Sequence, residues 1–224
     1  MAVKADGNTI RTERTRARIL AESLSQFNQR GEAHVTTGMI AAALDMSPGN
    51  LYYHFRNKDQ IVEQLFAAFE ERVDVRPRAS AGGPEAVEDL WLYLHLMLEG
   101  IWDYRFLYRN LDDLVWRNRR LRERFNRIVD RKFEAMVALC DGLVRARAMR
   151  AQPAEIRALT RNVLVVATYW LNYQSLRAPH ATTLSRADDN DLGQGAFQVM
   201  ALVAPYLVGD ARRHLDRLSQ HYID

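Results

Sequence analysis

Apolar residues recur along this chain at spacings of three and four, which is the period of an amphipathic helix. The clearest rows comprise Ala17, Leu20, Leu24 and Phe27; Val62, Leu65, Phe66, Phe69 and Val73; and Leu90, Trp91, Leu94, Leu98, Ile101 and Trp102. No long stretch alternates apolar and polar residues as a half-buried strand would. The pattern therefore predicts an all-α protein.

Capping and turn-forming residues divide this pattern into helices. Gly31 is placed to end the first helix, Thr36 to cap a short second one, and Ser47-Pro48 to start a third. Further helices are expected over 85–103, 105–116, 119–148, 153–177, 191–208 and 210–222, with a linker at 77–84 and a polar loop at 178–190. We therefore expect an N-terminal domain over residues 1–56, a connecting helix over 57–76 and a larger helical domain over 77–224.

The segment TTGMIAAALDMSPGNLYYHF, residues 36–55, holds two short helices separated by about three residues. That spacing is typical of a helix-turn-helix, whose second helix enters the major groove of DNA. At about 100° per residue, Leu51 and Phe55 share the core face of the second helix. Gly49, Asn50 and Tyr53 point away from the core, although none of them is a strong helix former.

This outward face predicts sequence-specific binding to double-stranded operator DNA. Gly49 lets the backbone approach closely, Asn50 can donate to and accept from a base edge, and Tyr53 can pack on a thymine methyl or bond a phosphate. The free N–H groups that open the preceding helix also favour a phosphate. The expected DNA contacts are Thr36, Thr37, Ser47, Pro48, Gly49, Asn50, Tyr52, Tyr53, His54 and Lys58.

The string SPGNLYYHFRNKDQI, residues 47–61, resembles the signature of TetR-family transcriptional regulators. The supporting frame of that family is also matched, so the resemblance covers about residues 10–75; the frame residues are Phe27, Gly31, Thr36, Ile40 and Ala41. The resemblance implies a three-helix DNA-binding domain followed by a larger domain that binds a small-molecule effector and dimerises. It also implies a ligand-responsive regulator, usually a repressor that its effector releases from a palindromic operator.

Asp45 departs from the family pattern, because the turn of the helix-turn-helix usually holds a glycine there. That position commonly needs a positive φ, which aspartate tolerates better than most residues with a side chain. The turn is therefore expected to survive with slight strain.

Candidate effector contacts lie among the aromatic, methionine and cysteine side chains of the larger domain, because such residues suit an adaptable apolar site. They are Trp91, His95, Leu98, Trp102, Phe133, Met136, Cys140, Tyr169 and Tyr173. The alternatives are that these rows are ordinary core, that His95 is a hydrogen-bonded core histidine and that Cys140 is a small buried hydrophobe. The segment IWDYRFLYRNLDDLVWRN, residues 101–118, also resembles TetR-like regulators associated with polyhydroxyalkanoate metabolism, which implies a fatty-acyl or other apolar ligand.

The segment NVLVVATYWLNY, residues 162–173, is apolar almost all round and must be covered on every side. We expect it to pair with residues 192–207 and to form a four-helix bundle between two subunits of a homodimer. The alternative is a monomeric core.

The net charge is only +3, but residues 105–132 alone carry a net charge of +6. Three interpretations are open for this arginine-rich segment. It forms a solvated face with internal ion pairs, such as Asp112 and Asp113 with Arg109 and Arg117; it gates an anionic ligand such as an acyl-thioester; or it adds non-specific attraction to DNA.

Several classes of protein are disfavoured. One cysteine excludes an internal disulfide and a multi-cysteine zinc site, and no secretory signal or 18-residue apolar run is present, which predicts a cytoplasmic protein without membrane contact. No metal or other cofactor is expected. A phosphate-binding glycine loop, an HExxH motif and a nucleophile elbow are all missing, so we do not expect an enzyme. The alternative function is a helical protein-binding adaptor, which would leave the outward face of residues 49–53 unexplained.

Overall fold

The computed structural model describes residues 3–74, 84–177 and 189–222, and these fold into α-helices and short 3-10 turns. The helices are α1 (Val3–Arg30), α2 (Thr37–Ala43), α3 (Pro48–His54), α4 (Lys58–Val73), α5 (Pro84–Asp103), α6 (Arg105–Arg109), α7 (Leu111–Arg117), α8 (Arg119–Arg145), α9 (Pro153–Arg177), α10 (Asp189–Val203) and α11 (Gly209–Ser219). The all-α prediction is confirmed. Most of the expected linker and most of the expected polar loop lie outside the described residues.

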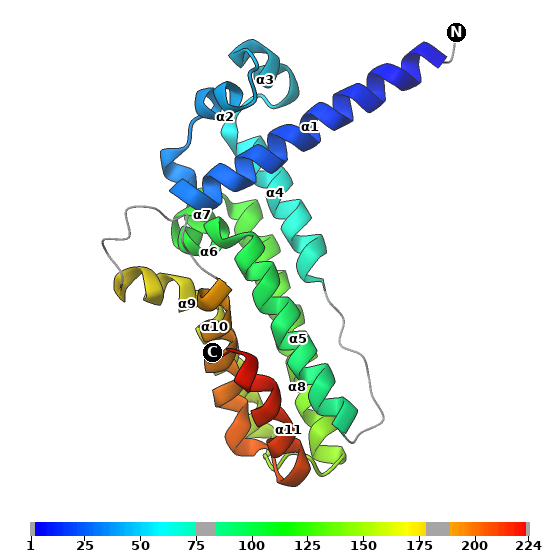
Figure 1. Cartoon of the computed structure of the whole chain (residues 1–224), viewed down its shortest axis with the longest axis vertical. Helices are drawn as coiled ribbons and strands as arrows, with labels where there is room; N and C mark the ends of the chain where they lie inside the picture. Colours follow the sequence, from blue (N-terminus) through cyan, green and yellow to red (C-terminus); the bar gives the residue numbers. More distant parts are fainter. Residues whose placement is uncertain (1–2, 75–83, 178–188, 223–224) are drawn as a thin grey trace.

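The first four helices form the N-terminal part of the molecule (Figure 1). There, α1 runs past α2 and α3, and α4 leads from them toward the larger bundle. The apolar face predicted for α1 is wrong at its first position. Ala17 is exposed, whereas Ile19, which the prediction left out, is fully buried together with Phe27. Residue 19 follows Ala17 by about 200° around the helix, so the two positions cannot share a face.

The larger bundle is built on α5 and α8, with α9, α10 and α11 packed beside them (Figure 1). The end of α4 packs very closely on α5 at Gly100, where a Cβ atom would lie 2.6 Å from Cγ1 of Val73. Glycine is therefore required at this crossing, because any side chain would push the two helices apart.

Two helices end earlier than the apolar pattern predicts. The single helix expected over 105–116 is divided into α6 and α7 at Asn110, whose φ of −117° and ψ of 25° are not helical. The helix expected over 119–148 ends at Arg145 because Arg147 adopts a positive φ of 57°. Periodicity cannot detect either break, since the apolar positions continue on both sides of it.

The two parts of the molecule are joined through the C-terminal end of α1. The amide nitrogen of Asn28 donates to the carbonyl of Asp103 at 2.8 Å, and its amide oxygen accepts from the N–H of Phe106 at 3.1 Å. Arg109 donates to the carbonyl of Asn28 at 3.2 Å. Asn28 thus fastens α1 to the junction between α5 and α6.

Candidate nucleic-acid interface and effector domain

The turn between α2 and α3 is built as the sequence predicts. The hydroxyl of Thr36 accepts from the N–H of Met39 at 3.2 Å, and that of Ser47 accepts from the N–H of Asn50 at 3.2 Å. Asp45 has a φ of 52°, so aspartate does occupy the left-handed position usually held by glycine. These caps fix where α3 begins and therefore which of its side chains face outward.

The two faces of α3 are confirmed. Leu51 and Phe55 are buried at 0% and 1% exposure, whereas Tyr53 is 77% exposed and Asn50 is also exposed. A Cβ atom added to Gly49 would meet nothing within 4 Å. Packing within the described protein therefore does not require a glycine at this position.

Two of the side chains expected to contact DNA also hold the domain together. The hydroxyls of Thr37 and Tyr52 lie 3.1 Å apart and tie α2 to α3. The rings of Tyr53 and His54 meet edge to face, with their centroids 5.2 Å apart. Burial and, second, the charge of Arg16 lower the pKa of His54, which favours its neutral form.

Arg16 is a supporting residue that the sequence analysis missed. One of its guanidinium nitrogens donates to the carbonyl of His54 at 2.5 Å, and its guanidinium lies 4.2 Å from the ring centroid of Phe55. It therefore caps the last turn of α3 from α1. Nothing in the local pattern marks this arginine, because its partners are 38 residues away.

The structure gives Lys58 an internal role that the sequence did not predict. Its ammonium lies 2.9 Å from the carboxylate of Glu32, and it donates to the carbonyls of Glu32 and Val35 at 2.9 and 3.2 Å. Glu32 is 1% exposed and also pairs with Arg117 of α7 at 3.0 Å. The predicted contact of Lys58 with DNA requires its ammonium to leave these partners.

The nine candidate effector residues do not gather at one place. Met136, Cys140 and Leu98 are in the core, and burial and, second, the charge of Asp141 raise the pKa of Cys140 to about 12. Phe133 lies under the guanidinium groups of Arg157 and Arg161, while Trp102 lies under that of Arg105. The structure agrees with the alternative interpretation of Cys140 as a buried small hydrophobe.

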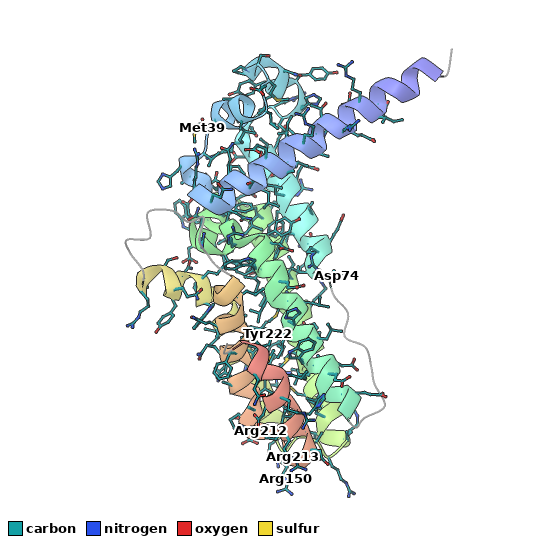
Figure 2. The ribbon with its side chains drawn as sticks, viewed as in Figure 1. Met39, Asp74, Arg150, Arg212, Arg213 and Tyr222 are labelled. Carbon is teal, nitrogen blue, oxygen red and sulfur yellow. The ribbon has the colours of Figure 1, made fainter. Side chains whose placement is uncertain are left out.

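His95 is held on three sides. Its Nδ1 lies 2.7 Å from the hydroxyl of Tyr222, its Nε2 lies 3.2 Å from the carboxylate of Glu99, and its ring stacks on Trp91. Tyr222, labelled in Figure 2, thus fastens the C-terminal turn to α5. These contacts agree with the alternative interpretation of His95 as a hydrogen-bonded structural histidine.

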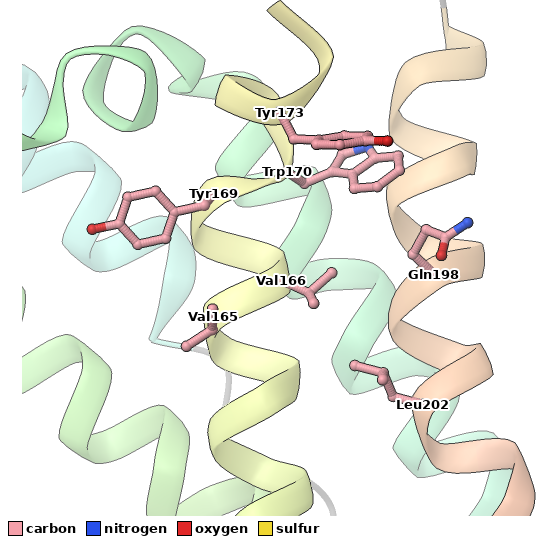
Figure 3. A pocket seen from close by; sticks show the side chains of 7 residues that line it. All are labelled: Val165, Val166, Tyr169, Trp170, Tyr173, Gln198 and Leu202. Carbon is pink, nitrogen blue, oxygen red and sulfur yellow. The ribbon is translucent and has the colours of Figure 1, made fainter. Parts of the chain in front are cut away.

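Tyr169 and Tyr173 line a groove between α9 and α10 that opens to the surface (Figure 3). The groove has a volume of about 430 Å³, and its other lining residues are Val165, Val166, Trp170, Gln198 and Leu202. Val165, Tyr169 and Tyr173 are 59%, 44% and 53% exposed. Within one chain, therefore, the predicted all-round apolar helix has one apolar face that is not covered.

Ion pairs engage part of the arginine-rich segment, namely Arg117, Arg119, Arg124 and Arg131. Arg117 pairs with Asp113 at 3.0 Å as predicted, and Arg124 and Arg131 both pair with Glu70 of α4. These two pairs lower the pKa of Glu70 against the opposing effect of its burial. The pairs agree with the interpretation of a solvated face, and they additionally tie α8 to the connecting helix.

Comparisons with known proteins agree with this geometry. Residues 19–65 match the family described as bacterial regulatory proteins of the tetR family, and residues 67–215 match the TetR family described as bacterial transcriptional repressors. A TetR-family transcriptional regulator from Marinobacter aquaeolei VT8 has a similar crystal structure, with 35% identity, a TM-score of 0.75, and coverage of 93% of this chain and 98% of that one. A tetR-family regulatory protein from Rhodococcus RHA1 shares the fold at 19% identity with a TM-score of 0.60, covering 87% of this chain and 98% of that one.

Curated relatives match over a shorter segment. The HTH-type transcriptional regulator TtgR of Pseudomonas putida is 33% identical over 87 residues, which are 39% of this chain. The chain spans only 41% of that relative's length, and 35% of the length of a second, the probable HTH-type transcriptional regulator ArpR of the same species. In addition, none of the described helices is long and apolar enough to cross a membrane.

Proposed function

From the premise that this chain belongs to the TetR family of bacterial transcriptional regulators, we propose that it is a repressor that a small apolar or acyl-type effector releases from a palindromic operator. The observation that carries the proposal is the outward face of α3. This face exposes Asn50 and Tyr53 beside Gly49, and no contact within the described protein requires a glycine there.

The proposed complex follows from the symmetry of a dimer. Two copies of α3 enter successive major grooves about 34–36 Å apart, and the two half-sites are read in opposite directions. Thr36 and Ser47 bring the N-termini of α2 and α3 to the surface, where backbone N–H groups can meet phosphates. In this complex Tyr53 lies on the base-contacting face with Asn50, and Tyr52 flanks that face.

The apolar groove between α9 and α10 supports the proposed homodimer. A soluble chain rarely leaves a contiguous apolar face open, and the exposed side chains of Val165, Tyr169 and Tyr173 form such a face. Close packing within the subunit is maintained by Gly195, where a Cβ atom would lie 2.8 Å from the ring of Trp170. Pairing of α9 and α10 with the same helices of a second copy gives the predicted four-helix bundle.

Selection of bound sequences from a random duplex pool tests the proposal. The full-length wild type is expected to enrich a palindrome at physiological salt, while Asn50→Ala and Tyr53→Ala enrich no sequence or a degraded one. Leu92→Ala, at a 38% exposed position on α5, is the control and is expected to enrich the wild-type sequence. Lys58 is unsuitable for this test, because its replacement leaves the buried carboxylate of Glu32 with one cation fewer.

The alternative of a protein-binding adaptor makes the opposite prediction. An adaptor enriches no sequence in the wild type, and replacement of Asn50 or Tyr53 changes nothing in the selected pool. A single half-site without a repeat would instead contradict the proposed dimer symmetry while leaving DNA recognition standing.

Oligomeric state is tested separately by sedimentation or light scattering. Val165→Glu and Tyr173→Glu are expected to convert the dimer to a monomer, because each places a charge within the exposed apolar face. Leu92→Glu introduces the same charge at an exposed apolar position elsewhere, and this control is expected to remain dimeric. A wild type that sediments as a monomer at micromolar concentration would refute the homodimer.

A further inference from the structure

One cation interrupts the apolar core face of α8. The buried residues of this helix are Leu121, Phe125, Ile128, Lys132, Met136, Cys140 and Leu143, of which only Lys132 is charged. Lys132 is 7% exposed. Among the described residues, its ammonium makes no hydrogen bond or ion pair. A buried charge without a partner is costly, so the packing of the bundle alone does not explain this residue.

The choice of lysine is itself informative. The sequence contains three lysines and 28 arginines, so lysine is the rare cation of this chain. A buried lysine can release its proton, whereas arginine cannot. Burial and, second, the charge of Arg131 lower the pKa of Lys132 to about 7. In the folded protein the side chain of Lys132 can therefore be a neutral amine. It can take up a proton and become an ammonium when a negative group approaches it.

A second buried polar group without a partner lies on α9, the helix that packs on α8. Phe133, the neighbour of Lys132, lies beneath Arg157 and Arg161 of α9, with guanidinium carbons 5.0 and 5.5 Å from its ring centroid. Thr160 stands between these two arginines in the sequence, is fully buried, and its hydroxyl has no hydrogen-bond partner. From α5, the hydroxyl of Tyr93 donates to the backbone carbonyl of Lys132 at 3.3 Å.

We propose that the larger domain binds a carboxylate attached to an apolar body, with the carboxylate accepting from Lys132 and Thr160. A carboxylate only accepts hydrogen bonds, which matches an ammonium and a hydroxyl that have no acceptors. Apolar side chains on the same face of α8, such as Met136, surround the body of the ligand. The inference rests on the proposed function only in treating this ligand as the effector.

Binding at this position also supplies a physical route to a response. Lys132 does not line the groove between α9 and α10 described above, and it lies on α8, which packs on α5 and on α9. In this proposal the ligand favours the arrangement of α5, α8 and α9 that leaves room for it. Since α8 is tied to α4 through Arg124 and Glu70, parting these helices displaces the helix that carries the DNA-binding domain.

Titration of the full-length protein with matched ligand pairs tests the proposal. The probes are decanoate against 1-decanol and 4-phenylbutyrate against 4-phenyl-1-butanol, with binding measured by tryptophan fluorescence and by the shift in melting temperature. At least one carboxylate is expected to bind the wild type about tenfold or more tightly than its alcohol, the ratio that one charge-assisted hydrogen bond can provide. Lys132→Met is expected to abolish this preference and to leave the affinity for the alcohol nearly unchanged.

Two further variants separate a ligand contact from a change in packing. Thr160→Val keeps the shape and removes the hydroxyl, so it is expected to lower the affinity for the carboxylate by a few-fold. Met136→Leu changes the apolar wall and is expected to affect the carboxylate and the alcohol equally. Equal affinity of the wild type for both members of each pair, no binding of either carboxylate, or an unchanged preference in Lys132→Met overturns the proposal.

Operator binding measured on the same samples separates this inference from the proposed function. Lys132→Met is expected to bind the operator like the wild type and to lose only the release by carboxylate. If the wild type binds no operator yet shows a carboxylate preference that depends on Lys132, the repressor proposal fails and the ligand site stands.

Discussion

The carboxylate of Glu32 lies 3.0 Å from the guanidinium of Arg117, and this ion pair joins the turn after α1 to α7. Glu32 is buried and takes its second cation from Lys58, so one carboxylate links the base of the recognition domain, the connecting helix and the larger domain. Because buried carboxylates depend on their partners, the geometry of all three segments is set at this point.

Replacement of Arg117 by Met is expected to weaken this link. Arg117 is 43% exposed, so the solvent-screened loss of stability should be modest, about 1 kcal/mol, measured by chemical denaturation. The larger effect is expected on coupling, with a smaller change in operator affinity when the effector is added. Arg119→Met, which removes an exposed pair with Glu123 on α8, is the control and should change neither quantity. Unchanged coupling in Arg117→Met would show that the domains communicate elsewhere.

Gly49→Ala separates fold from recognition. The added methyl meets nothing within 4 Å in the protein and should raise the free energy of unfolding by a few tenths of a kcal/mol, since alanine favours a helix. Operator affinity is nevertheless expected to fall about tenfold, because the methyl occupies the space between α3 and DNA. Gly142→Ala, on α8, is the matched control: it also has room for a methyl and should leave operator affinity unchanged. A stabilised Gly49→Ala with wild-type affinity would place DNA elsewhere.

The crossing of α4 and α5 should not accept a side chain larger than that of glycine at residue 100. A Cβ atom at residue 100 would lie 2.6 Å from Val73, so Gly100→Ala is expected to destabilise the protein by about 1–3 kcal/mol. Thermal and chemical denaturation measure the loss. Val73→Ala combined with Gly100→Ala should recover part of it, because the two side chains then share the space, and the double-mutant cycle should give a favourable coupling energy. If the losses of stability in the two single variants simply add in the double variant, the helices move apart and the two side chains do not compete for this space.

Lys132 gives the stability of the protein a characteristic pH dependence. Its pKa is lowered from 10.5 to about 7, so between these values the unfolded chain binds the proton and the folded chain does not. Stability attributable to this residue therefore rises with pH, with a limiting slope of about 1.4 kcal/mol per unit. The difference in free energy of unfolding between the wild type and Lys132→Met, measured from pH 7 to 8.5, should show this rise. Staying below pH 9 avoids Tyr93, whose burial raises its pKa in the folded state. A flat difference would mean that Lys132 keeps its proton on folding.

Local signals account for what the sequence predicted well. The caps at Thr36 and Ser47, the positive φ of Asp45 and the two faces of α3 each depend on residues within a few positions of one another. Such features follow from backbone chemistry and helical period, and all of them were confirmed.

Contacts between residues far apart in the sequence could not be predicted from such local signals. The pair of Glu32 and Arg117 spans 85 positions, and the support of α3 by Arg16 spans 38, so no periodicity reveals either. Lys58 stands in a DNA-binding signature, yet only the fold shows that a buried carboxylate already holds it. The candidate effector residues were chosen for their type, and residue type alone cannot distinguish core, surface and pocket.

The short helix α6 contacts both α1 of the N-terminal part and α9 of the larger bundle. Its first turn receives Asn28 of α1, and the carbonyl of Tyr108 accepts from Asn172 of α9 at 3.3 Å. Because a helix of five residues is too short to bend internally, α6 connects α1 to α9 as one rigid element. If the proposed operator and dimer sites are correct, a genetic selection for regulators locked in one state should recover substitutions clustered in α6. Such alleles would be dominant when mixed dimers form.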